Sequence, residues 1–305
     1  MEPAGQDFLA RIEAARSVVD IERACGEVVP STLPGKAPGA REAFSRALAG
    51  ALHGHLSRHC RHPQYRRWLD SYFGLRRESY RSPLQQPGYI YYPALAPVPW
   101  FSADEHPGLA PLHASLPDVA AEIAGFLATD QAFSPYVEAA AARDARWRAL
   151  ASSPAWSSLH LVKAGIADEA LLASLPRTRA FLDAAPLAEY PPHAPECFIS
   201  RLMPGVVLPP HFGVSNIKLT VHVPIDLPPQ GCSITVAGET RDWREGEFLV
   251  FDDSFEHSAE NLSDRSRTVL IFDVWHPGLD ETERAALAHT IRALDATQRV
   301  LAGLG

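Results

Sequence analysis

The sequence predicts an α+β protein: a jelly-roll core, that is, a cupin-like double-stranded β-helix, flanked by helices and preceded by a helical N-terminal region. Three observations support this fold class. Short runs between residues 197 and 277 alternate apolar and polar side chains with a period of two, and Pro, Gly, Asn, Asp and Ser separate them, as in antiparallel strands. Apolar residues before position 80 recur at helical spacing. A last amphipathic pattern closes the chain over residues 279–304.

The N-terminal part of the chain is expected to be helical. Helices are predicted over residues 5–26, 40–60 and 62–80, with a Pro/Gly-rich break at 26–39. The proline-rich stretch that follows reads as an extended linker into the sheet domain. The predicted division is therefore a helical region, 1–88, and a jelly-roll domain with a C-terminal helix, 89–305.

Further elements are expected around the sheet. Residues 155–165 alternate as a strand, and residues 114–128 have the early acidic residues of a helix. Residues 166–186 are predicted to form helical structure that covers one face of the sheet. We expect the C-terminal helix to pack on the outside of the barrel or at a dimer contact.

Histidines gather in the second predicted helix and just after it, at His53, His55, His59 and His62. Histidines four residues apart lie on one face of a helix, so the group resembles a metal cluster at first sight. No carboxylate lies among them, whereas arginines do. We therefore expect an exposed basic face.

Alternation along two predicted strands places their polar residues on one face. In residues 217–225 the polar face is formed by Lys218, Thr220 and His222, opposite Leu219, Val221 and Val223. In the last strand Arg267 shares its face with Val269, Ile271 and Asp273. An arginine enclosed among apolar residues needs an anion, because an unpaired buried charge is very costly. The anion can be an Asp or Glu side chain or the carboxylate of a ligand.

Two histidines and this arginine form a spaced set: His211, then His257 46 residues later, then Arg267 ten residues after that. Taken singly, either histidine could be an ordinary one among the thirteen in the chain. Two neutral imidazoles converging inside a small barrel suit a divalent transition metal. The order of the set is that of non-haem iron oxygenases, in which the arginine holds the far carboxylate of 2-oxoglutarate.

Several motifs resemble the aspartyl/asparaginyl β-hydroxylases: FDDSFEH at 251–257, RTVLIFDVWHP at 267–277, and PPHFGVSNIKLTVHVPI at 209–225 with ISRLMPG before it. The likeness runs from about Tyr89 to Pro277. It implies a dioxygenase that uses Fe(II), 2-oxoglutarate and O2 to hydroxylate an unactivated carbon, foremost the β-carbon of an aspartyl, asparaginyl or related residue. The resemblance implies that Fe(II) is bound by His211 and His257. It implies that 2-oxoglutarate is bound by Ser200, His222 and Arg267.

The metal site departs from the usual pattern of two histidines and a carboxylate. The position two after His211 is Gly213, which has no side chain. Animal members of the family also lack this carboxylate, so water could fill the place, or chloride as in radical halogenases. The resemblance places Asp253 near iron-bound water, as the catalytic candidate.

The substrate side also departs from the family. Thr220 stands where the peptide hydroxylases have a basic residue that faces the substrate carboxylate, although Lys218 lies on the same face. Trp156, Lys218 and Thr220 are the candidate substrate residues. The substrate could be an amino acid, a peptide or a residue on a carrier protein, in a bacterial biosynthetic setting.

Composition excludes some classes of partner. The net charge of −8 and the lack of a basic block argue against a nucleic-acid surface. No apolar run of a length that spans a bilayer occurs, and the N-terminus does not read as a signal peptide. Cys25, Cys60, Cys197 and Cys232 show no paired spacing, so we expect reduced thiols in a cytoplasmic protein. A metal-free jelly roll that only binds a ligand or partner is the alternative from another functional class.

Overall fold

The structure, a computed structural model, describes residues 2–30, 33, 39–129 and 132–304. The Pro/Gly-rich break predicted at 26–39 lies partly outside these residues. The chain forms two compact units. One is helical and comprises Met1–Ser79, Tyr190–Pro192 and Asp280–Gly305, and the other contains the sheets and comprises Tyr80–Glu189 and His193–Leu279.

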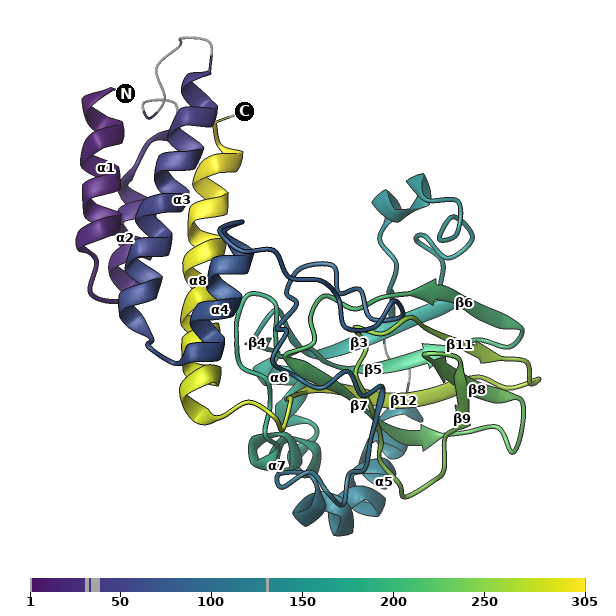
Figure 1. The fold of residues 1–305 in the computed structure, drawn as a ribbon. Helices are drawn as coiled ribbons and strands as arrows, with labels where there is room; N and C mark the ends of the chain where they lie inside the picture. The colour runs from purple at the N-terminus through teal and green to yellow at the C-terminus, as the bar shows by residue number, and fades with distance from the viewer. Residues whose placement is uncertain (1, 31–32, 34–38, 130–131, 305) are drawn as a thin grey trace. The chain divides into compact units, whose positions relative to one another are not determined.

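The helical unit contains α1 (Pro3–Ala14), α2 (Val18–Glu27), α3 (Ala40–His59), α4 (Pro63–Tyr72) and α8 (Glu281–Ala302) (Figure 1). The single helix predicted over residues 5–26 is broken in two. The Ser17 hydroxyl accepts a hydrogen bond from the Asp20 amide at 3.2 Å, and the Asp20 carboxylate accepts one from the Ser17 amide at 3.0 Å. This reciprocal cap starts a new helix at Val18, because it satisfies two amides that a continuous helix would bond internally.

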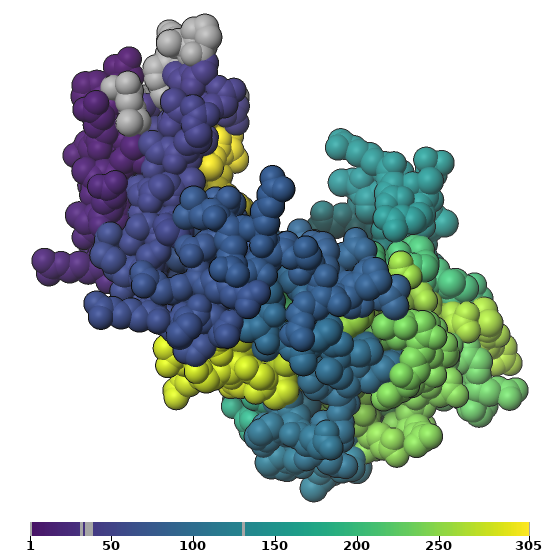
Figure 2. All heavy atoms as spheres, in the orientation of Figure 1, coloured from purple at the N-terminus to yellow at the C-terminus, as the bar shows by residue number. Residues whose placement is uncertain are grey.

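The C-terminal helix α8 packs against α2, α3 and α4 and so belongs to the helical unit, whereas the sequence analysis expected it on the outside of the barrel or at a dimer contact. Its predicted apolar stripe, with Leu287 and Ile291 fully buried, supplies the core of the helical unit. The Tyr65 hydroxyl of α4 also bonds the Thr290 hydroxyl of α8 at 2.7 Å. Helix α3 also packs against α1 (Figure 2).

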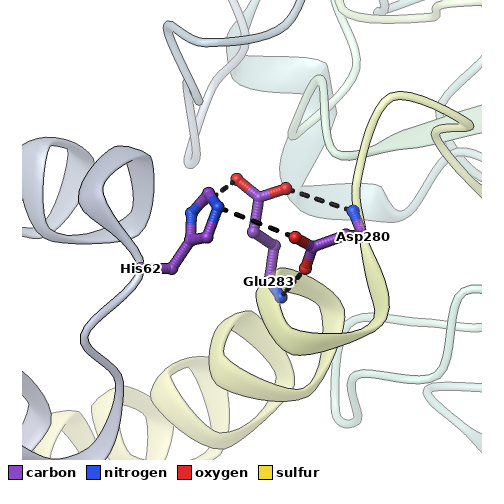
Figure 3. A group of neighbouring side chains, drawn as sticks. All are labelled: His62, Asp280 and Glu283. Atoms are coloured by element: carbon purple, nitrogen blue, oxygen red, sulfur yellow. Dashed lines mark hydrogen bonds and ion pairs between the residues drawn. The ribbon is translucent and has the colours of Figure 1, made fainter.

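A histidine and two carboxylates meet where α8 begins (Figure 3). Asp280 and Glu283 cap the helix reciprocally, each carboxylate accepting from the other residue's amide at 2.8 and 3.1 Å. The second oxygen of each carboxylate faces His62, whose Nε2 lies 3.6 Å from Asp280 and whose Nδ1 lies 3.2 Å from Glu283. Because opposite nitrogens of one imidazole face different carboxylates, the ring bridges the pair. His62 therefore has the acidic partners that the sequence analysis did not foresee.

Of the expected exposed basic face, His59 is exposed together with Arg58 and Arg61, whereas His55 is buried. His55 is only 4% exposed, and its Nδ1 donates to the Ala15 carbonyl at 3.0 Å. Its Nε2 lies 3.1 Å from Nε2 of His289 on α8, and the His59 ring stacks on His289 with centroids 3.5 Å apart. Burial lowers the pKa of all three imidazoles, that of His289 to about 3. The three rings are thus neutral and in contact with one another, with His59 also exposed to solvent.

Acid should loosen the contact between these rings. The three imidazoles have folded-state pKa values below the unfolded value of about 6.5, so the unfolded chain binds more protons as the pH falls. The stability that they contribute is present above pH 6.5 and is lost below it. We expect the melting temperature of the helical circular-dichroism signal to fall between pH 7 and pH 4. His289→Gln should flatten that dependence, whereas His113→Gln, an exposed histidine of the other unit, should leave it unchanged. Equal slopes in both variants would contradict this origin of the pH dependence.

The sheet unit contains two antiparallel sheets. The larger has the strand order β1-β10-β7-β12-β5-β3-β2, with β4 beside β3, and the smaller has the order β6-β11-β8-β9. Three helices, α5 (Leu116–Leu127), α6 (Glu169–Ala173) and α7 (Pro176–Ala184), belong to this unit, with short 3₁₀ turns at Ala110–Ser115 and Ala139–Arg143. The strands are β1 (Trp100–Phe101), β2 (Ser134–Pro135), β3 (Trp156–Lys163), β4 (Ile166–Ala167), β5 (Cys197–Leu202), β6 (Val206–His211), β7 (Lys218–Asp226), β8 (Cys232–Val236), β9 (Glu239–Asp242), β10 (Leu249–Phe251), β11 (His257–Asn261) and β12 (Arg267–Trp275).

Two hydrophobic cores lie on opposite faces of the large sheet. Val221 and Phe272 pack in one buried cluster with Val119 of α5 and Phe181 of α7, so helices cover this face. On the other face a second cluster joins residues of the large sheet to residues of the small one. The predicted α+β fold, a jelly-roll core flanked by helices with a helical N-terminal region, is therefore confirmed. The predicted alternation of β7 and β12 is confirmed too. The face with Val221 and Phe272 packs under the helices, whereas the face with His222, Arg267 and the apolar Ile271 is turned to the small sheet.

The structure bears on two expectations from composition, the state of the cysteines and the lack of a membrane-spanning segment. All four cysteines are unpaired. Among the helices of the described residues, none combines the length and the apolar character that crossing a bilayer requires.

Candidate functional site

A cavity of about 440 Å³ lies between the two sheets. It brings together all of the site residues that the sequence analysis selected, although they come from six strands and a loop. Its walls include Trp156 (β3), Ser200 (β5), His211 (β6), Lys218, Thr220 and His222 (β7), Asp253, His257 (β11) and Arg267 (β12).

The paired histidines are direct neighbours across β6 and β11. His257 is in register with His211, and their ring centroids are 4.0 Å apart. The Nδ1 of His211 bonds the Pro209 carbonyl at 2.8 Å, and the Nδ1 of His257 bonds the Phe255 carbonyl at 2.9 Å. A carbonyl only accepts, so both Nδ1 atoms carry the proton and both Nε2 lone pairs are available. Such an outer hydrogen bond fixes the tautomer and orientation of a metal-binding imidazole.

Electrostatics keep these rings neutral at pH 7, as metal ligation requires. Burial lowers the pKa of His211 to about 4, with the neighbouring His257 adding to the effect. Burial likewise lowers the pKa of His257. Imidazole nitrogens suit iron and the other middle and late first-row transition metals. The pair therefore fits a divalent metal of that kind, for which His211 and His257 would be the protein ligands.

Asp253 fills the space beside this pair that a side chain at position 213 would need. A Cβ atom on Gly213 would overlap the Asp253 carboxyl group, so only glycine permits this arrangement. The Gly213 amide also donates to the Asp253 carbonyl at 2.6 Å. Asp253 Oδ1 is buried and has no hydrogen-bond partner within the described residues. The space beside Gly213 is thus not vacant, because the carboxylate of Asp253 from another loop occupies it.

At the other end of the cavity, Arg267 is 2% exposed. Its Nε and Nη1 have no hydrogen-bond partner, and no carboxylate within the part of the chain that the structure describes pairs with it. Its guanidinium lies over the Trp243 ring, 4.6 Å from the centroid. Burial lowers the pKa of Arg267 to about 10, which still leaves it charged at pH 7. Of the two anions that the sequence analysis left open, the structure favours a ligand.

Two neighbours of Arg267 can also donate to such a ligand. The indole nitrogen of Trp243 donates to His222 Nδ1 at 3.1 Å. Because an indole only donates, His222 Nδ1 must be the acceptor, and its proton lies on Nε2. Burial and the nearby Arg267 hold the His222 pKa well below its usual range, so the ring stays neutral. The Trp156 indole donates to the Ser200 hydroxyl at 3.1 Å, which leaves the hydroxyl proton of Ser200 for a ligand.

Lys218 joins the metal side of the cavity to β12. Its ammonium bonds Asp253 at 2.9 Å, Asp273 at 2.7 Å and the Thr220 hydroxyl at 3.2 Å. Burial raises the pKa of Asp273. Lys218 is thus a buried ion-pair residue that orients Asp253.

Sequence reasoning missed three parts of the site. Trp243 lies in the turn after β9, where nothing in the local pattern marks it as a neighbour of Arg267. Asp252 fixes the loop that carries Asp253, by accepting from Gln85 at 2.9 Å and from the Ser254 amide at 2.9 Å. Tyr136 stacks on Trp156 with centroids 4.0 Å apart and lines the cavity. The doubled aspartate in FDDSFEH was a possible signal for Asp252, whereas Trp243 and Tyr136 carried none.

This jelly roll with a paired-imidazole site can be compared with known proteins. The family model described as Aspartyl/Asparaginyl beta-hydroxylase matches residues 113–277. The chain belongs to this family.

Individual relatives cover parts of the chain. It is 43% identical over 88 residues to the aspartyl/asparaginyl beta-hydroxylase of Mus musculus, which covers 29% of this chain and 12% of that protein. It is 30% identical over 213 residues to aspartate beta-hydroxylase domain-containing protein 2 of Homo sapiens, covering 68% of this chain and 55% of that one. Among solved structures, the Cupin_2 domain of an XRE family transcriptional regulator from Enterobacter cloacae is 15% identical with a TM-score of 0.27, covering 40% of this chain and 98% of that one. The chain thus spans from about an eighth to about half of these two curated relatives.

Replacing the unpaired guanidinium should not destabilise the protein. Arg267→Met removes a buried charge without a carboxylate partner and keeps a side chain of similar length. Apolar replacement of buried charged groups is often neutral or stabilising, by up to about 4 kcal/mol. The lost contact with Trp243 opposes this by about 2 kcal/mol. We expect the free energy of unfolding, measured by urea denaturation in a carboxylate-free buffer, to be unchanged or raised.

Arg265→Met is the matched control, since Arg265 is exposed and pairs with Asp226 at 2.8 Å. It should change stability by no more than about 1 kcal/mol. A loss of more than about 3 kcal/mol in Arg267→Met, the range seen when a buried pair is broken, would show that Arg267 has a structural partner.

Proposed function

We propose that this protein is an Fe(II)- and 2-oxoglutarate-dependent dioxygenase that hydroxylates an unactivated carbon, foremost the β-carbon of an aspartyl, asparaginyl or related amino-acid residue. The substrate would be free, in a peptide or bound to a carrier protein, in a bacterial and cytoplasmic setting. One observation carries the proposal: a buried arginine that has no carboxylate partner among the described residues shares a cavity with two neutral imidazoles whose Nε2 atoms are available to a metal. Family membership supports it.

The cavity residues would have different roles according to their position. Bound iron would supply the activation of O2 and the oxidation of a C–H bond, coupled to decarboxylation of 2-oxoglutarate. Arg267 would bind the distal carboxylate of 2-oxoglutarate, with His222 Nε2 and the Ser200 hydroxyl as further donors. His211 and His257 would hold the metal, with their rings fixed by the Pro209 and Phe255 carbonyls.

Asp253 and the aromatic wall would control water. Asp253 Oδ1 can accept a hydrogen bond from a water molecule at the metal position, while Lys218 holds its other oxygen. Tyr136 and Trp156 form an apolar wall that limits solvent access to the cavity. Exclusion of water protects reactive species from side reactions.

The same geometry weighs against the alternatives. A halogenase needs room for chloride beside the metal, and the space next to Gly213 contains the Asp253 carboxylate, which repels an anion. A metal-free binding module has no need of two oriented imidazoles. Hydroxylation is therefore the proposed reaction.

Anaerobic calorimetry separates the two binding sites. The wild-type chain should bind one Fe(II) and then one 2-oxoglutarate. His257→Ala should lose the metal. Arg267→Met should keep the metal but lose about 2–5 kcal/mol of 2-oxoglutarate binding, because a buried charged partner is removed.

Arg265→Met is again the matched control and should bind both ligands as the wild type does. Unchanged 2-oxoglutarate affinity in Arg267→Met would remove Arg267 from the proposed role. Unchanged Fe(II) affinity in His257→Ala would do the same for the histidine pair.

A further inference from the structure

The substrate side of the cavity is poor in available positive charge. Besides Arg267, which the proposed function assigns to 2-oxoglutarate, the charged residues among the described lining are Lys218, Asp253, Asp273 and Glu196. These four lining residues are therefore one cation and three carboxylates. Even with Asp273 neutral, the balance of these side chains is negative.

The single cation is fully engaged. An ammonium group has three N–H donors, and Lys218 directs its donors to three acceptors: Asp253, Asp273 and the Thr220 hydroxyl. Lys218 is 4% exposed, so solvent offers it little freedom to reorient. Thr220 lies within 3.4 Å of Asp273 as well, as a hydroxyl donor. This corner thus presents no donor to an incoming carboxylate.

The remaining acidic group lies on another wall of the cavity. Glu196 accepts from the Ala164 amide at 2.6 Å, and its second oxygen lies 3.3 Å from His160 Nε2. These contacts hold the side chain in place without a permanent cation beside it. The wall next to it is aromatic, with Phe198 tilted against Tyr136 at 5.2 Å between centroids. A negative group entering here would lose hydration beside the Glu196 carboxylate and the rings of Tyr136 and Phe198.

We propose that the substrate group that enters this cavity is uncharged or cationic and does not carry a carboxylate. The inference rests on the proposed function, since it assigns Arg267 to the cosubstrate. Within the substrate class of that function, it favours an amide, an aliphatic chain or an amine over an aspartyl side chain. The physical reason is that an unpaired carboxylate in a desolvated site is strongly disfavoured.

Two isosteric probes test this selectivity. N-acetyl-asparagine methylamide and N-acetyl-aspartate methylamide have nearly the same shape and differ by one charge. Binding to the anaerobic full chain with Fe(II) and 2-oxoglutarate is followed by saturation-transfer NMR and by quenching of the cavity tryptophans. We expect the asparagine probe to bind at least about tenfold more tightly. Equal binding, or tighter binding of the aspartate probe, would overturn the inference.

A variant that frees Lys218 gives a second measurement. Asp273→Asn keeps the shape but removes one of the two charges that engage the ammonium. It should increase affinity for the aspartate probe, so that the preference narrows or reverses. The control is Asp226→Asn, because Asp226 is an exposed carboxylate at the end of β7, the strand that carries Lys218. It should leave the ratio of the two probe affinities as in the wild type. An unchanged ratio in a folded Asp273→Asn protein would contradict the role of Lys218.

Failure of the proposed function and failure of the inference about the substrate give different results. Binding of Fe(II) and 2-oxoglutarate is measured on the same samples before either probe is added. Loss of that binding in the wild type would overturn the proposed function. Normal cosubstrate binding together with a preference for the aspartate probe would overturn only the inference about the substrate.

Discussion

The enclosure of Arg267 without a carboxylate partner is the constraint on which the site depends. The guanidinium lies on the inner face of β12, against the ring of Trp243. Trp243 in turn donates to His222 and so fixes the tautomer of that ring. At this end of the cavity, Nε and Nη1 of Arg267 therefore have no hydrogen-bond acceptor among the residues that the structure describes. Such an arrangement costs stability and is expected at a site that binds an anion.

The jelly roll places this anion site and the histidine pair on facing sheets. Antiparallel register on β12 sets Val269 beside Ser200 and Ile271 beside His222. On the small sheet the pairing of β6 with β11 sets His257 beside His211. The other face of the large sheet is buried against α5 and α7. The same alternation that forms the cores thus points the polar side chains into the space between the sheets.

Much of this arrangement follows from local pattern. Period-two alternation was sufficient to assign the faces of β7 and β12, and the motif around FDDSFEH selected residues that the structure brings into one cavity. Contacts between distant segments were not predictable in this way. The filling of the space beside Gly213 by Asp253 depends on how two loops meet, and the stacking of His289 on His59 depends on how α8 packs on α3. Nothing in the residues near Trp243 signals its place beneath Arg267.

The visible absorption spectrum of the anaerobic protein tests the central claim most directly. A keto acid that chelates Fe(II) produces a charge-transfer band that neither component gives alone. We predict this band when Fe(II) and 2-oxoglutarate are both added to the wild-type chain. We predict its loss when His211 and His257 are both replaced by alanine. No band in the wild type at saturating concentrations, or a band that persists in the double variant, would contradict it.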